Sequence, residues 1–246
     1  MSRWIPFFIL PVLLSAPNPC AAGTSGIDLA WGTCAMTGGS GDQYFACDTN
    51  YPLAPYRLAM VFRSPSSIPD FAGVSMTLNI CTSLSAGLPD WWKLGPGQCR
   101  DGAFTFPAAT SGLGSTCTDI WIGHETGGGF VAQPVSPSRI RIVMDFAAAD
   151  TAQVTAGVRY VGGVATLDRQ STVPGGSSVC AGCLEGVSLY LQGVELFGFS
   201  PSEDYMLSYQ DTRQFVLWQG GDTYGPFCVP DPTRNATWGA IKSMYR

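Results

Sequence analysis

Charged side chains are scarce in this chain. They make up 13% of the 246 residues, and Lys93 and Lys242 are the only lysines, whereas about a quarter of the residues in a typical globular domain are charged. The formal net charge is -5. A protein that binds nucleic-acid phosphates or anionic lipid headgroups needs clustered basic side chains. The composition therefore predicts no nucleic-acid partner and disfavours an anionic membrane surface.

Helical periodicity is also scarce, and the sequence has no fixed-period repeat and no low-complexity linker. Only two short segments have a helical pattern: about two turns in residues 146–154 and about one turn in residues 88–94. No apolar run beyond the N-terminal segment is long enough to form a transmembrane helix. We therefore expect a single domain without a transmembrane segment.

Residues 1–22 have the plan of a secretion signal. Arg3 supplies a positive charge, an apolar run of about eleven residues follows it, and small side chains surround Ala22. Cleavage after Ala22 would leave residues 23–246 as the mature chain. Lipidation at Cys20 is the alternative, which the prolines just before it disfavour. We expect a secreted protein, located outside the cell, in a periplasm or at the cell surface.

Nine cysteines stand in the sequence, and Cys20 lies in the expected signal, so eight remain. An even set of cysteines behind a secretion signal predicts a disulfide framework in an oxidising compartment. We expect all eight to form bridges: Cys34, Cys47, Cys81, Cys99, Cys117, Cys180, Cys183 and Cys228. Closure between near neighbours favours Cys34–Cys47, Cys99–Cys117 and Cys180–Cys183, which leaves Cys81–Cys228. Eight cysteines permit many other pairings, so this assignment is a hypothesis.

The motif Cys180-Ala181-Gly182-Cys183 has three interpretations: a redox pair, half of a zinc site or a small structural disulfide loop. A redox pair is typically found at a helix N-terminus, and this motif precedes a predicted strand. Zinc would need two more ligands, and the chain has one histidine, His124, and no second motif of this kind. We favour the structural loop and expect neither a metal ion nor a cofactor.

Alternation of apolar and polar residues predicts strands along most of the chain. The pattern is clear in residues 57–63, 74–81 and 139–146. In residues 187–199 it changes phase at Gly193, which predicts a bulge or a bend. Shorter candidates are residues 27–31, 119–122, 158–164 and 215–218. With 30 glycines and 18 prolines between these runs, we predict an all-β protein: an antiparallel β-sandwich of jelly-roll, cohesin-like or immunoglobulin-like type.

Adjacent tryptophans provide the first candidate binding site. Trp91 and Trp92 fall in a predicted loop, and flat exposed aromatic rings can stack on the CH groups of a sugar. The competing interpretation is that both indoles fill the end of the sandwich core.

Acid–base groups provide weaker candidates. His124 stands beside Glu125, but adjacent side chains on an extended chain point to opposite faces, so we interpret His124 as a loop residue. Asp145 and Glu195 lie on predicted strands and could meet in space, as a pair of hydrolytic carboxylates must. Nothing in their context singles them out, and we assign no catalytic residue.

Five segments together resemble a group of exported bacterial proteins that carries no assigned activity. They are Ile27-Asp28-Leu29-Ala30-Trp31 ahead of Cys34, Phe45-Ala46-Cys47, Leu88-Pro89-Asp90-Trp91-Trp92, Cys99-Arg100 and Cys180-Ala181-Gly182-Cys183. The resemblance covers most of the mature chain. It implies a bacterial source, a periplasmic or extracellular location and a β-sandwich similar to cohesin-like and other surface modules.

These observations favour a secreted, non-enzymatic β-sandwich with a surface, structural or adhesion role. The first alternative is a carbohydrate-binding module that uses Trp91 and Trp92. The second is a hydrolase, which requires two carboxylates, or His124 and a nucleophile, in one cleft. A glycan or another extracellular protein is the expected partner.

Overall fold

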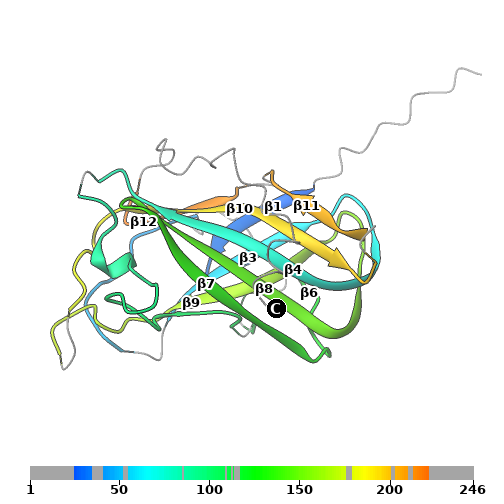
Figure 1. Ribbon diagram of the computed structural model, residues 1–246, viewed down its shortest axis with the longest axis horizontal. Helices are drawn as coiled ribbons and strands as arrows, with labels where there is room; N and C mark the ends of the chain where they lie inside the picture. The colour runs from blue at the N-terminus through cyan, green and yellow to red at the C-terminus, as the bar shows by residue number, and fades with distance from the viewer. Residues whose placement is uncertain are drawn as a thin grey trace, which may run out of the picture.

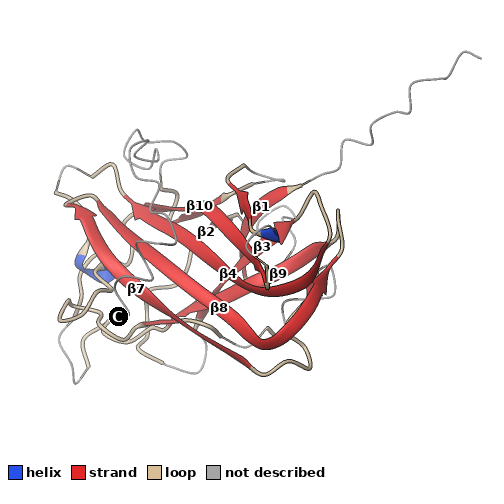
Figure 2. Ribbon diagram, turned by 45° about the vertical axis from the view of Figure 1, so that its right-hand side comes forward, coloured by secondary structure: helices blue, strands red, loops and turns tan. Residues whose placement is uncertain are grey.

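The computed structural model describes residues 25–34, 41–51, 55–84, 86–108, 110–111, 113, 117–175, 179–200, 203–209 and 213–221. The predicted signal peptide, residues 1–22, and the predicted bridging residue Cys228 lie outside this set. Within it, the chain forms two β-sheets that pack face to face, as Figure 1 and Figure 2 show. The predicted all-β sandwich is therefore confirmed. No helix in the described ranges is both long and apolar enough to cross a membrane.

The first sheet is built around three long strands. It has the order β1 (Gly26–Trp31), β3 (Tyr56–Arg63), β9 (Arg159–Leu167) and β5 (Phe104–Thr105), and β6 (Thr118–Asp119) also pairs with β9. Neighbours in this sheet run antiparallel, except that β6 is parallel to β9.

The second sheet contains the longest strands. Its order is β2 (Asp42–Gln43), β12 (Phe215–Trp218), β10 (Val187–Gly198), β4 (Ile68–Cys81), β8 (Arg139–Val154) and β7 (Thr126–Ser136), with β11 (Tyr205–Leu207) paired to β10. Only the β12–β2 pair is parallel.

The core lies between the two sheets and follows the predicted alternation. On β4, Met76 and Leu78 are buried and stand opposite Met144 and Ile142 of β8. Side chains of β3 such as Met60 belong to the same buried cluster. Because successive side chains point to opposite faces of a strand, the unshifted pairing of residues 73–81 with residues 139–147 places every second residue of these stretches in this core.

The predicted bulge at Gly193 is confirmed. The pairing of β10 with β4 shifts by one residue between Leu191 and Gly193, so Gln192 is the extra residue. Leu191 before the bulge and Val194 after it are both buried. The segment is one bent strand, and the bulge is what keeps both of its halves directed toward the core.

The helix predicted at residues 146–154 is wrong. Strand β8 continues through this segment to Val154, and Ala152 and Val154 pair with Phe71 and Ile68 of β4. Alanine-rich local preference is overridden here by ladder hydrogen bonds and burial against β4. The turn predicted at residues 88–94 is present as one 3-10 turn, Asp90–Trp92.

Candidate functional site

Three disulfides among the described residues join segments that are distant in sequence. They are Cys34–Cys117, Cys47–Cys183 and Cys99–Cys180, with sequence separations of 83, 136 and 81 residues. Cys81 is also disulfide-bonded, while its predicted partner Cys228 lies outside the described residues.

The three predicted local bridges are therefore wrong. Cys34 pairs with Cys117 in place of Cys47, and Cys99 pairs with Cys180 in place of Cys117. Short separation was the only guide in the sequence, whereas the fold brings the loops of both sheets together and lets distant cysteines meet. The Cα atoms of the bridged cysteines are 5.8 to 5.9 Å apart, which is a usual separation for a disulfide.

The CxxC motif is a junction between two bridges. Cys180 bonds to Cys99 and Cys183 bonds to Cys47, so the small loop disulfide predicted for Cys180 and Cys183 does not form. Gly182 makes this divergence feasible: its φ is +96°, and a Cβ there would lie 2.4 Å from Cβ of Pro89. Because each sulfur is committed to a different partner, the motif has no dithiol pair to cycle.

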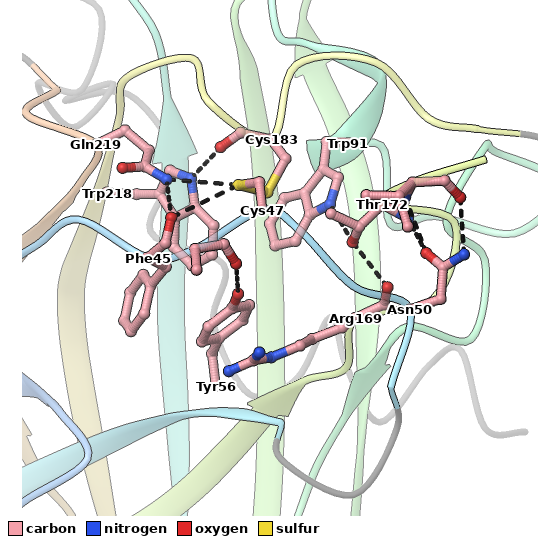
Figure 3. Close-up of a disulfide and its surroundings, with 12 residues drawn as sticks. Phe45, Cys47, Asn50, Tyr56, Trp91, Arg169, Thr172, Cys183, Trp218 and Gln219 are labelled. Carbon is pink, nitrogen blue, oxygen red and sulfur yellow. Dashed lines mark hydrogen bonds between the residues drawn. A yellow bond between two sulfur atoms is a disulfide. The ribbon is translucent and has the colours of Figure 1, made fainter. Parts of the chain in front are cut away.

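An aromatic cluster fills the sandwich end beside the Cys47–Cys183 bridge (Figure 3). The ring of Trp218 lies at its centre, with five ring centroids between 4.5 and 5.8 Å away: Phe45, Trp91, Tyr56, Trp92 and Trp31. The indole nitrogen of Trp218 donates to the carbonyl of Cys183 at 2.6 Å. The bridge and the cluster therefore form one packed unit.

The predicted sugar platform is absent from this end. Trp91 and Trp92 are both 0% exposed, so neither indole offers a face to a ligand. The indole nitrogen of Trp91 donates to Oγ1 of Thr172 at 3.1 Å, which satisfies its polar atom inside the protein. The competing interpretation, that these two residues pack the end of the core, is the correct one.

A buried arginine covers the other side of Trp91. Cζ of Arg100 lies 3.7 Å from the centre of the Trp91 ring, and its Nη1 donates to the Trp91 carbonyl at 3.2 Å. Nη2 reaches both the carbonyl and the carboxylate of Asp168. Burial lowers the pKa of Arg100 to about 10, and Asp168 opposes that shift. Arg100 therefore remains a cation at neutral pH and has a packing role next to Cys99.

Asn50 ties the loop after Cys47 to the loop before Cys180. Its Oδ1 accepts hydrogen bonds from the backbone nitrogens of Thr172 and Val173 at 2.8 and 2.9 Å, and its Nδ2 donates to the carbonyl of Val173 at 2.7 Å (Figure 3). All of the polar atoms of this amide are used. The bridges, the rings and these hydrogen bonds together fix the loops at this end.

One open cavity adjoins the aromatic cluster. It has a volume of about 350 Å³ and is lined by Trp31, Gly32, Gln43, Phe45, Pro55, Tyr56, Arg57 and Arg169. Cζ of Arg169 lies 4.5 Å above the ring of Tyr56. The hydroxyl of Tyr56 donates to the carbonyl of Ala46 at 2.7 Å, and burial raises the pKa of Tyr56 above its ordinary value. Aromatic residues and two arginines thus line one recess.

A second cavity, of about 470 Å³, adjoins the 3-10 turn. Its wall includes Leu88, Pro89 and Glu185, together with Asp90 and Lys93. The last two form an exposed ion pair at 2.6 Å. The charge of this lysine therefore has its carboxylate partner within the same wall.

His124 lies far from the end of the sandwich that holds the Cys47–Cys183 and Cys99–Cys180 bridges. Its Nδ1 is 2.7 Å from Oδ1 of Asp150 on β8, and this hydrogen bond lowers the pKa of Asp150. The Arg139 end of β8 stands opposite Cys81, so Asp150 lies toward the other end of the strand. The partner of His124 is thus an exposed aspartate, and Glu125 is not involved.

Asp145 and Glu195 do come near each other, as the strand pattern suggested. They occupy β8 and β10 on either side of β4, and both pair in register with Ser75. Burial raises the pKa of Glu195, and the carboxylates of Asp204 and Asp145 add to that shift. Neither carboxylate lines either of the two cavities described above.

No protein-family model, no curated protein and no solved structure matches this chain. The resemblance to exported bacterial proteins therefore remains an expectation.

Sequence reasoning missed the residues of the arginine-lined cavity. Phe45 stands two residues before Cys47, and Arg169 follows the end of β9. Neither belongs to a motif that names a site, and the two come together only because a disulfide and two strands place their loops side by side. The one available signal was the alternating strand pattern of residues 57–63, which begins directly after Tyr56.

Proposed function

We propose that this protein is an exported, non-enzymatic β-sandwich that serves as a surface, structural or adhesion component outside the cytoplasm. The observation that carries the proposal is the cross-linked end of the sandwich, where two disulfides, the aromatic cluster and the Asn50 hydrogen bonds meet. Disulfides form and persist in oxidising compartments, whereas cysteine thiols are kept reduced in the cytosol.

The size of the chain supports this role. A sandwich of this length buries enough apolar surface to fold without cross-links, and its core spans both sheets. Each bridge then adds about 2–4 kcal/mol in the chain-entropy picture. Stability beyond the needs of folding favours a protein that persists in a harsh exterior.

The first test concerns compartment and durability. The full chain is expressed in a bacterial host with its own N-terminus, and the thiols of each cell fraction are counted by alkylation and mass spectrometry. We expect the protein outside the cytoplasm with its cysteines resistant to alkylation until reductant is added. We also expect reduction to shorten its half-life in protease severalfold. Recovery from the cytoplasm with free thiols would overturn the proposal.

The second test concerns activity. The purified oxidised protein is incubated with a panel of polysaccharides, esters and peptides, and products are followed by chromatography. We expect no turnover of any of them and retention of the protein on intact cell envelopes. Turnover that disappears in Asp145→Asn or Glu195→Gln would replace the proposal with the hydrolase alternative.

A further inference from the structure

An acidic row, formed by Asp145, Ser75 and Glu195, crosses the outer face of the second sheet. Ser75 of β4 pairs in register with Asp145 of β8 on one side and with Glu195 of β10 on the other. These three strands lie side by side (Figure 1). Directly paired residues point to the same face of a sheet, and the neighbours of Ser75 on β4, Val74 and Met76, belong to the core. The three polar side chains therefore share the face that is directed away from the core.

Ser75 stands at the centre of the acidic row. Neighbouring strands are about 4.8 Å apart, so the backbones of Asp145 and Glu195 are roughly 10 Å apart with Ser75 between them. Ser75 is 8% exposed, and its hydroxyl makes no hydrogen bond within the described part of the chain. Oδ1 of Asp145 is also buried without a hydrogen-bond partner there. Buried polar atoms normally have partners, so the row has unused acceptors for a ligand.

The carboxylates of the acidic row are not neutralised by described residues. Asp145, Glu195 and the neighbouring Asp204 form no ion pair within that part of the chain. Burial raises the pKa of Glu195, and the charges of Asp204 and Asp145 raise it further. The nearest arginine along β8 is Arg141, two pairs of residues away. The fold thus holds like charges close together at a cost in stability, which is characteristic of a functional site.

The bulge in β10 brings Glu195 into the acidic row. With Gln192 as the extra residue, Val194 and Leu196 point into the core and Glu195 points outward. Without that insertion the strand would present the opposite face, and Glu195 would point inward. Bulges commonly re-aim a side chain in this way next to a site.

Apolar side chains flank the acidic row. Met206 of β11 pairs with Glu195 and is 56% exposed. Val143, two residues before Asp145 on β8, pairs with Val131 of β7, which is 49% exposed. A ligand that combines a cationic tip with an aliphatic stem would contact both the row and its flanks.

A lysine side chain matches these groups better than other cations do. Its ammonium has three N–H donors and no acceptor, which suits one hydroxyl and two carboxylates. Its four methylene groups suit the apolar flanks, whereas the planar fork of arginine suits two oxygens of a single carboxylate. The described residues contain no group of three or more His, Cys, Asp or Glu side chains placed to hold a metal ion, so a metal is the weaker choice.

A second copy of this chain is poorly equipped to supply that lysine. The chain has only two lysines, and one of them, Lys93, is paired with Asp90. The net charge of -5 instead attracts a basic partner. Charge complementarity therefore favours a different protein.

We propose that the acidic row binds a lysine ammonium on a segment of a basic extracellular protein. The ammonium lies above Ser75 between the two carboxylates, and the stem of the lysine lies against Met206 and Val143. The inference supplies a partner for the proposed surface role, on which it rests.

The test is calorimetric titration of the oxidised full chain with three blocked pentapeptides: Lys-Leu-Lys-Leu-Lys, Arg-Leu-Arg-Leu-Arg and Glu-Leu-Glu-Leu-Glu. We expect the lysine peptide to bind with an affinity that falls as salt is added, the arginine peptide to bind about threefold or more weakly, and the acidic peptide not to bind. Calcium chloride is titrated in the same way. Absent binding of the lysine peptide, equal binding of the arginine peptide, or tighter binding of calcium would overturn the proposal.

Variants assign the site. Glu195→Gln and Asp145→Asn should each weaken binding of the lysine peptide about tenfold or more, and Ser75→Ala should weaken it about fivefold. Instability cannot explain the result for Glu195→Gln, because removing a charge that burial disfavours leaves the fold at least as stable at pH 7.

Glu185→Gln is the matched control. It removes the same charge from an exposed residue in the loop before β10, and the affinity for the lysine peptide should not change. Unchanged binding in Glu195→Gln, or an equal loss in Glu185→Gln, would place the peptide elsewhere and overturn the assignment. Compartment and protease resistance are measured without peptide, so failure of this proposal is distinguishable from failure of the surface role.

Discussion

At the scale of single residues, Trp218 has the greatest structural influence. It is fully buried, five aromatic rings surround it, and its indole nitrogen holds the backbone at Cys183. Aromatic pairs contribute beyond the area they bury, since ring edges and faces carry opposite partial charges. The position therefore couples β12 to the disulfide-linked loops.

Replacing this ring should be costly. We expect Trp218→Ala to lower the free energy of unfolding by about 3–5 kcal/mol, because the cavity it leaves is walled by other rings that cannot collapse into it. Urea denaturation followed by circular dichroism measures the change. Phe199→Ala, at a residue that is 80% exposed, is the matched control and should change stability by less than about 0.5 kcal/mol. Equal effects of the two substitutions would contradict the central role of Trp218.

Glu195 supplies a pH-dependent prediction at the same scale. Because burial raises its pKa in the folded protein, folding favours the protonated acid, and its contribution is present below the unfolded pKa of about 4.3 and lost as pH rises through the folded value. Glu195→Gln should therefore raise the urea midpoint at pH 7 and lose that advantage at pH 4. Glu125→Gln, at an exposed glutamate, should leave the midpoint unchanged at both pH values. A gain that is the same at both values would rule out titration as the cause.

At the scale of elements, the bulge in β10 decides which face of the strand is buried. Gln192 is the extra residue, and its side chain accepts a hydrogen bond from Nδ2 of Asn79 at 2.9 Å. A shift of one residue in a strand moves every following side chain to the other face. The orientation of Val194 and Leu196 therefore depends on this single insertion.

Deletion of Gln192 tests that dependence. We expect the deletion to place Val194 and Leu196 on the outer face and to abolish cooperative unfolding, as seen by loss of the near-ultraviolet circular dichroism signal. Gln192→Ala keeps the residue count and removes only one hydrogen bond, so it should fold with a loss of about 1 kcal/mol. A deletion variant with native spectra would show that the register is set elsewhere.

The strands and the bulge in β10 are largely predictable from the sequence. Alternation identified β3, β4 and β8, and the change of phase at Gly193 located the bulge, because both are consequences of the two-residue period of a strand. The extension of β8 to Val154 was not predictable, since local preference at residues 146–154 is helical and pairing with β4 overrides it. Disulfide partners and the arginine-lined cavity arise from contacts between loops far apart in sequence, which no local pattern encodes.

At the scale of the whole molecule, the bridges act on the unfolded chain as much as on the folded one. Cys47–Cys183 and Cys34–Cys117 close long segments of 136 and 83 residues, so each removes many unfolded conformations. The Cys34–Cys117 bridge also covers the outer face of the first sheet, where Cys34 packs with Ala59, Val61 and Val164.

Removing one bridge should therefore reduce stability without erasing the fold. For Cys47→Ala with Cys183→Ala we expect a loss of about 2–5 kcal/mol in the free energy of unfolding, measured by denaturation under non-reducing conditions. The matched pair Cys34→Ala with Cys117→Ala should lose a similar amount, because the two closed loops differ by less than a factor of two in length. Full retention of stability by either pair would contradict a stabilising role for that bridge.

The connectivity has a consequence for biogenesis. The Cys34–Cys117 bridge interleaves with the Cys47–Cys183 and Cys99–Cys180 bridges, since Cys47 and Cys99 lie inside its span and their partners lie beyond it. An oxidase that joins cysteines in the order in which they emerge during export would first link Cys34 to Cys47, which is not a native pair. Reaching the native set then requires thiol–disulfide exchange. The protein should depend on a disulfide isomerase in its host, and a strain without that enzyme should accumulate scrambled, protease-sensitive forms.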